Sequence, residues 1–316
     1  MGQTGTHAAP ARQESRRFLP ALGTWAFFLT FSGQGVRNIV GWVPFGGIAA
    51  VSGILLLVVF VREGHRIPWR SLPVASCAYT ALCVLSLAWS QFPHETALAA
   101  ALMAATSATG ILLGCGLSLR QLTVALGRAL EATIALSLAL EAYVALILGR
   151  PLPPLYMRHW EHIPPSYYWS EARLLQGGPI QGIVGNRNPL AFIALLTLIC
   201  VVVRWRDHRL RLPNFLTWST LSILTLVLTG SATVIVAAIV CGIVMSFMWL
   251  LRHVPVALRT TVTVAASTLG VAAVAFAIGW HSQVTALLGR SPDMTGRWEI
   301  WLKVIDLWEQ HTFLGW

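Results

Sequence analysis

The stretch "VIVAAIVCGIVMSFMWLL", residues 234–251, decides the fold class, because it places 18 residues in a row without a charged side chain. A helix of about 20 apolar residues crosses the roughly 30 Å hydrocarbon core of a bilayer. Comparable apolar runs recur along the 316-residue chain, of which 56% is hydrophobic and only 11% is charged, with a mean hydropathy of +0.67. Soluble domains carry roughly a quarter charged residues. The sequence therefore predicts an all-α, polytopic transmembrane helical bundle.

The apolar runs predict about nine spans. They lie near 18–35, 42–61, 72–90, 96–118, 123–148, 187–203, 213–229, 231–251 and 259–280. In domain terms, an N-terminal arm (1–17) precedes a transmembrane domain (18–280), and a polar segment (281–316) follows it.

Arginines set the predicted orientation. They gather in the N-terminal arm and in every second loop, as in "RWRDHRLR" (204–211). The positive-inside rule then places the N-terminus in the cytoplasm of a multi-pass cytoplasmic-membrane protein. The long loop 149–186 and the segment 281–316 fall on the outer face. This orientation accounts for the net charge of +10, so we expect membrane lipids as partners and no nucleic acid.

The outer segment contains a predicted helix from about 296 to 311. Trp298, Trp301, Ile305 and Trp308 recur at helical spacing on one face, and charged side chains fall on the opposite face. A helix of this kind is typical of a segment that lies flat on a membrane surface.

Cofactor and metal motifs are missing from the sequence. The five cysteines lie inside apolar runs without metal-ligand spacing, and no phosphate-binding glycine loop is present. We therefore expect no cofactor and no metal. Glu131 and Glu141 fall within a predicted span, where a carboxylate is a functional candidate. These two residues would serve a proton-coupled transporter.

Basic side chains on the predicted outer face are the sharper candidates, because the positive-inside rule disfavours arginine there. The planar guanidinium group binds phosphate with two parallel hydrogen bonds. Contacts with lipid headgroups would equally account for any single one. The set comprises Arg150, Arg158, Arg173, Arg187, Arg290 and Arg297, with Lys303.

Arg187 lies in "GIVGNRNPLAF" (182–192), between Asn186 and Asn188. Pro189 suits the first turn of the helix that follows. The arrangement predicts an arginine and two amides at a helix N-terminus, where backbone N–H groups also favour anions. It is equally consistent with a plain helix cap at Asn188.

Three motifs together resemble the O-antigen ligase and O-antigen polymerase superfamily, in its exopolysaccharide-production branch. They are "GIVGNRNPLAF" (182–192), "LTGSATVIVAAIV" (228–240) and "GRSPDMTGRWEIW" (289–301), and they follow one another at the spacing of that superfamily. The resemblance covers residues 180–316 well and the earlier spans only by topology.

The resemblance implies a membrane glycosyltransferase of GT-C type that takes a glycan from an undecaprenyl-diphosphate carrier at the outer face. The acceptor would be a lipid or another glycan. Arg187 and Arg297 would be the catalytic residues that offset the phosphate charge. The implied substrate-binding residues are Asn186, Asn188, Arg173, Thr295, Gly296, Glu299 and Ser231.

The sequence departs from the superfamily pattern at two places. Ala232 stands where ligases commonly have an arginine, which favours the exopolysaccharide branch. The superfamily's catalytic histidine belongs to a region beyond "FLGW" (313–316), so we expect a C-terminally truncated chain that is inactive alone. A non-enzymatic transporter, or an assembly component of polysaccharide export, is the alternative function.

Overall fold

The structure, a computed structural model, describes residues 10–164, 167–279 and 297–312. Within these ranges the chain forms helices joined by loops, together with one isolated antiparallel bridge between Leu152 and Ser170. The all-α prediction is therefore confirmed for the described part of the chain.

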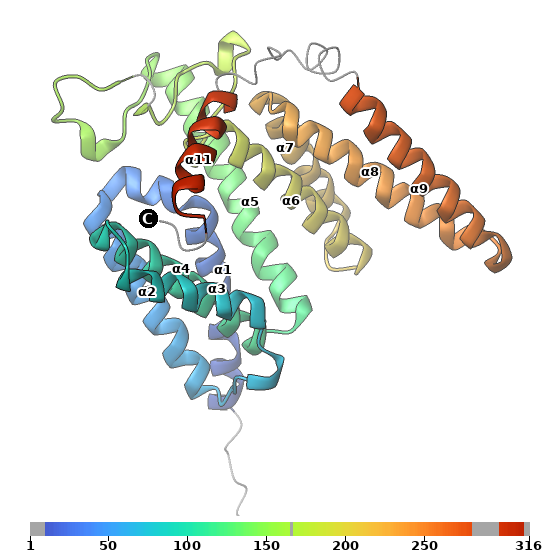
Figure 1. Cartoon of the computed structure of the whole chain (residues 1–316), viewed down its shortest axis with the longest axis horizontal. Coiled ribbons are helices and arrows are strands. Elements are labelled where there is room, and N and C mark those ends of the chain that lie inside the picture. Colours follow the sequence, from blue (N-terminus) through green and yellow to red (C-terminus); the bar gives the residue numbers. More distant parts are fainter. Residues whose placement is uncertain (1–9, 165–166, 280–296, 313–316) are drawn as a thin grey trace, which may run out of the picture. The chain divides into compact units, whose positions relative to one another are not determined.

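Two compact units make up the chain, and each is described by itself. The first runs to Leu85 and continues from Ala97 to Ile235, and the second combines Ser86–Thr96 with the residues from Val236 onward. The helices of the first unit are α1 (Pro10–Val40), α2 (Trp42–Arg62), α3 (Val74–Leu85), most of α4 (Pro93–Gly116), α5 (Leu119–Tyr143) with the π-helical turn η3 (Val144–Leu148), α6 (Arg187–Arg206) and α7 (Leu212–Thr229) (Figure 1). Those of the second are most of α8 (Ala232–His253), α9 (Val256–Gly279) and α11 (Arg297–Gln310).

Every predicted span falls on a helix, and among the described residues six helices are long and apolar enough to cross a membrane. These are α2, α4, α5 with η3, α6, α7 and α8. The first predicted span, 18–35, lies within α1, which extends into polar sequence at both ends. The other two fall on α3, which forms a shorter apolar segment Val74–Ala88 with the 3₁₀ turn after it, and on α9, whose apolar part is Val256–Ala272. The molecule is thus a multi-helix membrane protein by length and composition, and nine spans remain a prediction.

Exposed apolar side chains support this class. On α2, the side chains of Val43, Ile54 and Val61 are 87%, 61% and 64% exposed. Large contiguous apolar surfaces are rare on soluble monomers and mark contact with lipid or with another protein. Lipid tails would cover this face of α2.

A single residue connects α1 to α2. Gly41 has φ +88°, a backbone conformation that L side chains rarely adopt, and it ends α1 while opening α2. The two helices then pack antiparallel: Gly33 lies against the Phe45 ring, and Trp25 Nε1 donates to Ser52 Oγ at 2.9 Å. The result is a tight helical hairpin with Gly41 at its tip.

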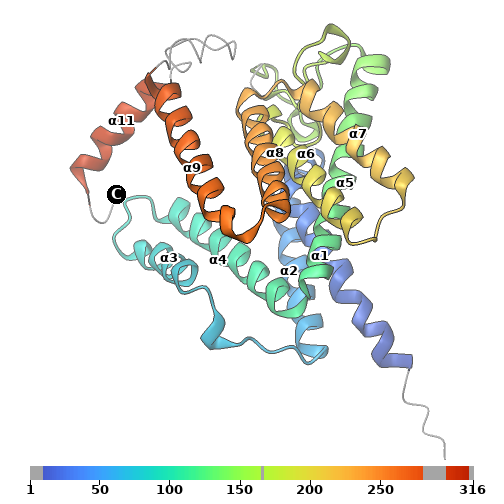
Figure 2. The same cartoon turned by 90° about the vertical axis from the view of Figure 1, so that its right-hand side faces the viewer.

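Helix α5 lies between α1 and α6 in the first unit (Figure 1; Figure 2 shows the same helices turned by 90°). It runs parallel to α1. The buried hydroxyl groups of Ser32 on α1 and Thr133 on α5 are hydrogen-bonded to each other. It runs antiparallel to α6, where Arg204 and Glu131 form a buried ion pair. Gly127 makes room for this pair, because a Cβ there would lie 2.7 Å from Arg204 Nη1.

These packing directions bring one set of helix ends together. The hairpin tip, the end of α5 and the start of α6 lie at one end of the first unit, which we call the loop end because the loop 149–186 joins α5 to α6 there. The end of α2, the start of α5 and the end of α6 lie at the opposite end. Eight of the arginines that we expect on the cytoplasmic side belong to that opposite end, namely Arg62, Arg66, Arg70, Arg120, Arg204, Arg206, Arg209 and Arg211.

The Glu131–Arg204 pair gives a first prediction. Arg204→Met leaves the Glu131 carboxylate buried without a cation, which costs roughly 3–5 kcal/mol. We expect a clear fall in the unfolding temperature of the detergent-purified protein, measured by tryptophan fluorescence. Most of the loss should return in Glu131→Gln/Arg204→Met, because neither side chain is then charged.

Arg209→Met is the matched control. Arg209 Nε lies 3.9 Å from Asp207 Oδ2, and both side chains are at least one-third exposed. Exposed pairs contribute about 0–1 kcal/mol, so this variant should unfold close to the wild type. Equal unfolding temperatures for Arg204→Met and Arg209→Met would contradict a stabilising role for the buried pair.

Candidate functional site

The loop 149–186 is irregular but closely tied to the helices. Its two arms meet at the isolated bridge, where Leu152 N donates to Ser170 O at 2.8 Å and Trp169 N donates to Leu152 O at 2.7 Å. Trp169 is buried, and its indole Nε1 donates to the carbonyl oxygen of Ile183 at 3.0 Å. The returning arm of the loop is therefore fixed before it reaches α6.

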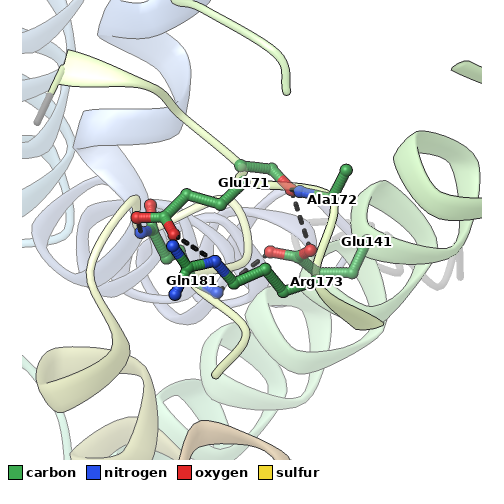
Figure 3. A network of polar contacts seen from close by, with 6 residues as sticks. Glu141, Glu171, Ala172, Arg173 and Gln181 are labelled. Atoms are coloured by element: carbon green, nitrogen blue, oxygen red, sulfur yellow. Dashed lines mark hydrogen bonds and ion pairs between the residues drawn. The ribbon is translucent and has the colours of Figure 1, made fainter. Parts of the chain in front are cut away.

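Glu141 of α5 holds this returning arm. Its side chain is buried, and one carboxylate oxygen accepts hydrogen bonds from the backbone N–H groups of Gln181, at 2.9 Å, and Gly182, at 2.8 Å. The other oxygen accepts from Ser170 Oγ at 2.8 Å. Figure 3 shows the carboxylate reaching from α5 into the loop. Charge-assisted hydrogen bonds of this kind are about twice as strong as neutral ones.

Two further polar residues of α5 continue the same face. Ser137 and Thr133 precede Glu141 by one and two helical turns. Ser137 Oγ accepts from Ile183 N at 3.2 Å, and Thr133 contacts α1 through its hydroxyl. A Cβ at Gly182 would lie 2.5 Å from Ser137 Cβ, so glycine is required for this approach. We call Thr133, Ser137 and Glu141 the α5 polar stripe.

The C-terminal end of α1, at the loop end, contacts the same segment. At Gly35 the helix approaches Ile183 so closely that a Cβ on this residue would lie 2.9 Å from the Ile183 carbonyl oxygen. Gly185, at φ +68°, lies against the Gln34 side chain, whose Nε2 would be 2.7 Å from a Cβ there. The segment 182–186 is thus held between α1 and α5 directly before α6 begins.

The start of α6 corrects one detail of the sequence interpretation. The cap is Asn186, whose Oδ1 accepts from Asn188 N at 3.0 Å, and it is not Asn188. Asn188 instead accepts from Ser231 Oγ at 2.9 Å. The cap precedes the expected position because the helix already begins at Arg187. Pro189 then lies in the first turn, as expected. The structure therefore joins two of the three sequence motifs directly, through Asn188 and Ser231.

The two loop-end arginines of the predicted site differ in their partners. Arg187 is exposed at the first position of α6 and makes no hydrogen bond or ion pair with the residues that the structure describes. Arg173 Nε lies 2.7 Å from a carboxylate oxygen of Glu171. The other oxygen of Glu171 accepts from Gln181 Nε2 at 2.9 Å (Figure 3). Arg187 keeps its full donor capacity for a ligand, whereas Arg173 already has a counter-ion.

The third motif is described only in part. The helix expected at 296–311 is confirmed as α11, which begins at Arg297 and ends at Gln310. Thr295 and Gly296 lie outside the described residues, as do the side chains of Arg297 and Glu299. Their roles stay predictions.

Sequence reasoning missed Thr133 and Ser137, which hold the site together with Glu141. The three residues of the α5 polar stripe recur at every fourth position, and this spacing was the available signal. Glu131 and Glu141 were selected as transport residues, yet each has its own partners in the structure. The glycines of "FSGQGVRN" (31–38) also marked a close approach, now seen between Gly35 and Ile183.

Comparison with protein-family models, with curated proteins and with solved structures finds no match. Only the fold and the site therefore define the class of protein. The described residues form an all-helical membrane protein, in which an exposed arginine lies at a capped helix start next to a loop held by hydrogen bonds.

The hydrogen bonds of Glu141 lead to a second prediction. Glu141→Ala leaves two backbone N–H groups and one hydroxyl without their acceptor, at roughly 1–3 kcal/mol for each buried group. We expect the loop 149–186 to become sensitive to limited proteolysis. Glu141→Gln should stay resistant, because its oxygen can accept both N–H groups and its NH₂ can donate to Ser170 Oγ.

Glu161→Ala serves as the control, since Glu161 is an exposed carboxylate of the same loop. It should be cleaved at the wild-type rate. If the loop of Glu141→Ala is as resistant as that of Glu161→Ala, Glu141 does not hold the loop.

Proposed function

We propose that the protein is a membrane glycosyltransferase that transfers or polymerises a glycan from an isoprenoid-diphosphate carrier at the outer face of the cytoplasmic membrane. The observation that carries the proposal is Arg187, an exposed cation at the capped N-terminus of α6 that has no partner among the described residues. A planar guanidinium binds phosphate, and the dipole of a helix start also favours an anion. The resemblance of the three motifs supplies the substrate class.

The proposed reaction is a substitution at the anomeric carbon. The acceptor hydroxyl oxygen forms a bond to that carbon and gives its proton to a base, while the bond to the carrier oxygen breaks. The isoprenoid diphosphate leaves with the electron pair. Arg187 and Arg297 offset the charge that develops on the phosphate, as preorganised cations do in other transfer reactions.

The rigid surroundings of Arg187 support this electrostatic role. Asn186 fixes the first turn of α6, and Asn188 ties that turn to Ser231, which is buried. A cation whose backbone is already fixed needs little reorganisation when the phosphate charge develops. Asn186, Asn188 and Ser231 then act by positioning, and Arg173 contributes only after it leaves Glu171.

The proposed topology has nine spans with the N-terminus in the cytoplasm and a GT-C-like arrangement. The distribution of arginines in the first unit supports it, because eight of those expected in the cytoplasm lie at the end opposite to Arg187. An excess of arginine in short loops marks the cytoplasmic side.

A transporter or an assembly component of polysaccharide export is the second candidate function. It would depend on a carboxylate that binds and releases a proton, at Glu131 or Glu141. Glu131 is engaged by Arg204, and Glu141 by three donors of the loop. These contacts support structural roles for both residues and so favour the glycosyltransferase.

The third prediction tests Arg187 directly. In membranes with the full-length gene product and a lipid-linked glycan donor, Arg187→Ala should lower kcat/KM for transfer by about 10²–10³, the usual effect of removing one preorganised donor. Arg187→Lys should recover part of the rate, because lysine keeps the charge without the planar fork.

Arg66→Ala is the control, since Arg66 is an exposed arginine at the opposite end of the first unit. Its rate should match the wild type. A normal transfer rate in Arg187→Ala would exclude the phosphate role, and loss of function in Glu141→Gln with normal loop resistance would favour the transporter.

A further inference from the structure

The tip of the α1–α2 hairpin carries an arginine that the sequence analysis did not select. Arg37 is half-buried, and its guanidinium carbon lies 4.4 Å from the centroid of the Trp42 ring. Its Nη2 donates to Asn38 Oδ1 at 3.3 Å. No carboxylate of a described residue lies within ion-pair distance of Arg37, so the side chain has an aromatic neighbour and an amide but no counter-ion.

This lack of a counter-ion is unusual for a cation in such a position. Arg37 Nε is buried and makes no hydrogen bond with the described residues. Removing a cation from water is costly unless an anion or several acceptors compensate. Arg204, the buried arginine at the opposite end of the unit, also has an Nε without a hydrogen bond, but its charge is compensated by Glu131. Arg37 has no such carboxylate among the described residues.

Arg37 also lies beside the segment that leads into Arg187. Gln34 contacts Gly185, and Arg37 follows Gln34 by three residues, a rise of about 4.5 Å along the same helix. Gly185 precedes Arg187 by two residues, which span at most about 7.6 Å. Both arginines therefore belong to the loop end of one unit, on elements in direct contact.

We propose that Arg37 is a second phosphate-binding residue that acts with Arg187 on a lipid-linked phosphate. The inference rests on the proposed function and extends it to a residue outside the three motifs. A guanidinium has five N–H donors, and the described contacts use one of them. Trp42 covers a face of the cation, which leaves its edge for phosphate oxygens.

Two sources supply this chemistry: the diphosphate of an isoprenoid carrier and the phosphodiester of an ordinary phospholipid. The test measures binding of a fluorescent farnesyl diphosphate to the purified 316-residue chain in zwitterionic nanodiscs. A parallel measurement counts the phosphatidylglycerol molecules that stay with the purified chain, by mass spectrometry of the bound lipids.

Arg37→Ala should weaken farnesyl diphosphate binding roughly tenfold or more, the effect of losing charge-assisted hydrogen bonds. Arg37→Lys should lose less, because it keeps the charge. Arg66→Ala, an exposed arginine at the opposite end of the first unit, should bind as the wild type does. Arg37→Gln can still donate to Asn38, so it replaces Arg37→Ala if the alanine variant unfolds.

The outcomes separate the two sources and the two proposals. A loss confined to farnesyl diphosphate assigns Arg37 to the carrier, and a loss confined to phosphatidylglycerol assigns it to a headgroup. Unchanged binding of both lipids in a folded Arg37→Gln overturns the inference. If Arg187→Ala alone abolishes binding, the proposed function stands without Arg37. If Arg37→Ala alone does so, Arg37 binds phosphate and the role of Arg187 fails.

Discussion

The carboxylate of Glu141 is the constraint on which the loop end of the molecule depends. One buried side chain accepts from Ser170, Gln181 and Gly182, and so joins the returning arm of the loop 149–186 to the central helix. Without this acceptor, two adjacent backbone N–H groups would be buried without partners. The placement of the segment 182–186, and hence of the α6 start, follows from these three hydrogen bonds.

Four arginines of the first unit differ in whether the protein supplies a carboxylate partner. Arg204 and Arg173 are neutralised within the protein, by Glu131 and Glu171. Arg187 and Arg37 have no carboxylate partner among the described residues, and both lie at the loop end. A protein that only stabilised its own fold would gain little from leaving these two cations without an anion. Their shared location is what an anionic ligand at that end would require.

The sequence predicted the features that depend on local pattern. Apolar runs identified the helices, and the tryptophan spacing identified α11, because helical periodicity is visible within a few turns. It could not predict that Glu131 meets Arg204, 73 positions away, or that Glu141 meets Gln181, 40 positions away. Such pairs depend on how the helices pack. The cap of α6 was placed two residues late, since Asn186 and Asn188 are equivalent by residue type alone.

The single-residue link at Gly41 has a mechanical consequence. A longer connecting loop would let α2 move relative to α1. The connection here is the single residue Gly41, at φ +88°, so there are no further loop residues that could change conformation. The two helices are also locked along their length by the Trp25–Ser52 hydrogen bond. A displacement of α2 in the bilayer would therefore also move the hairpin tip, and Arg37 with it.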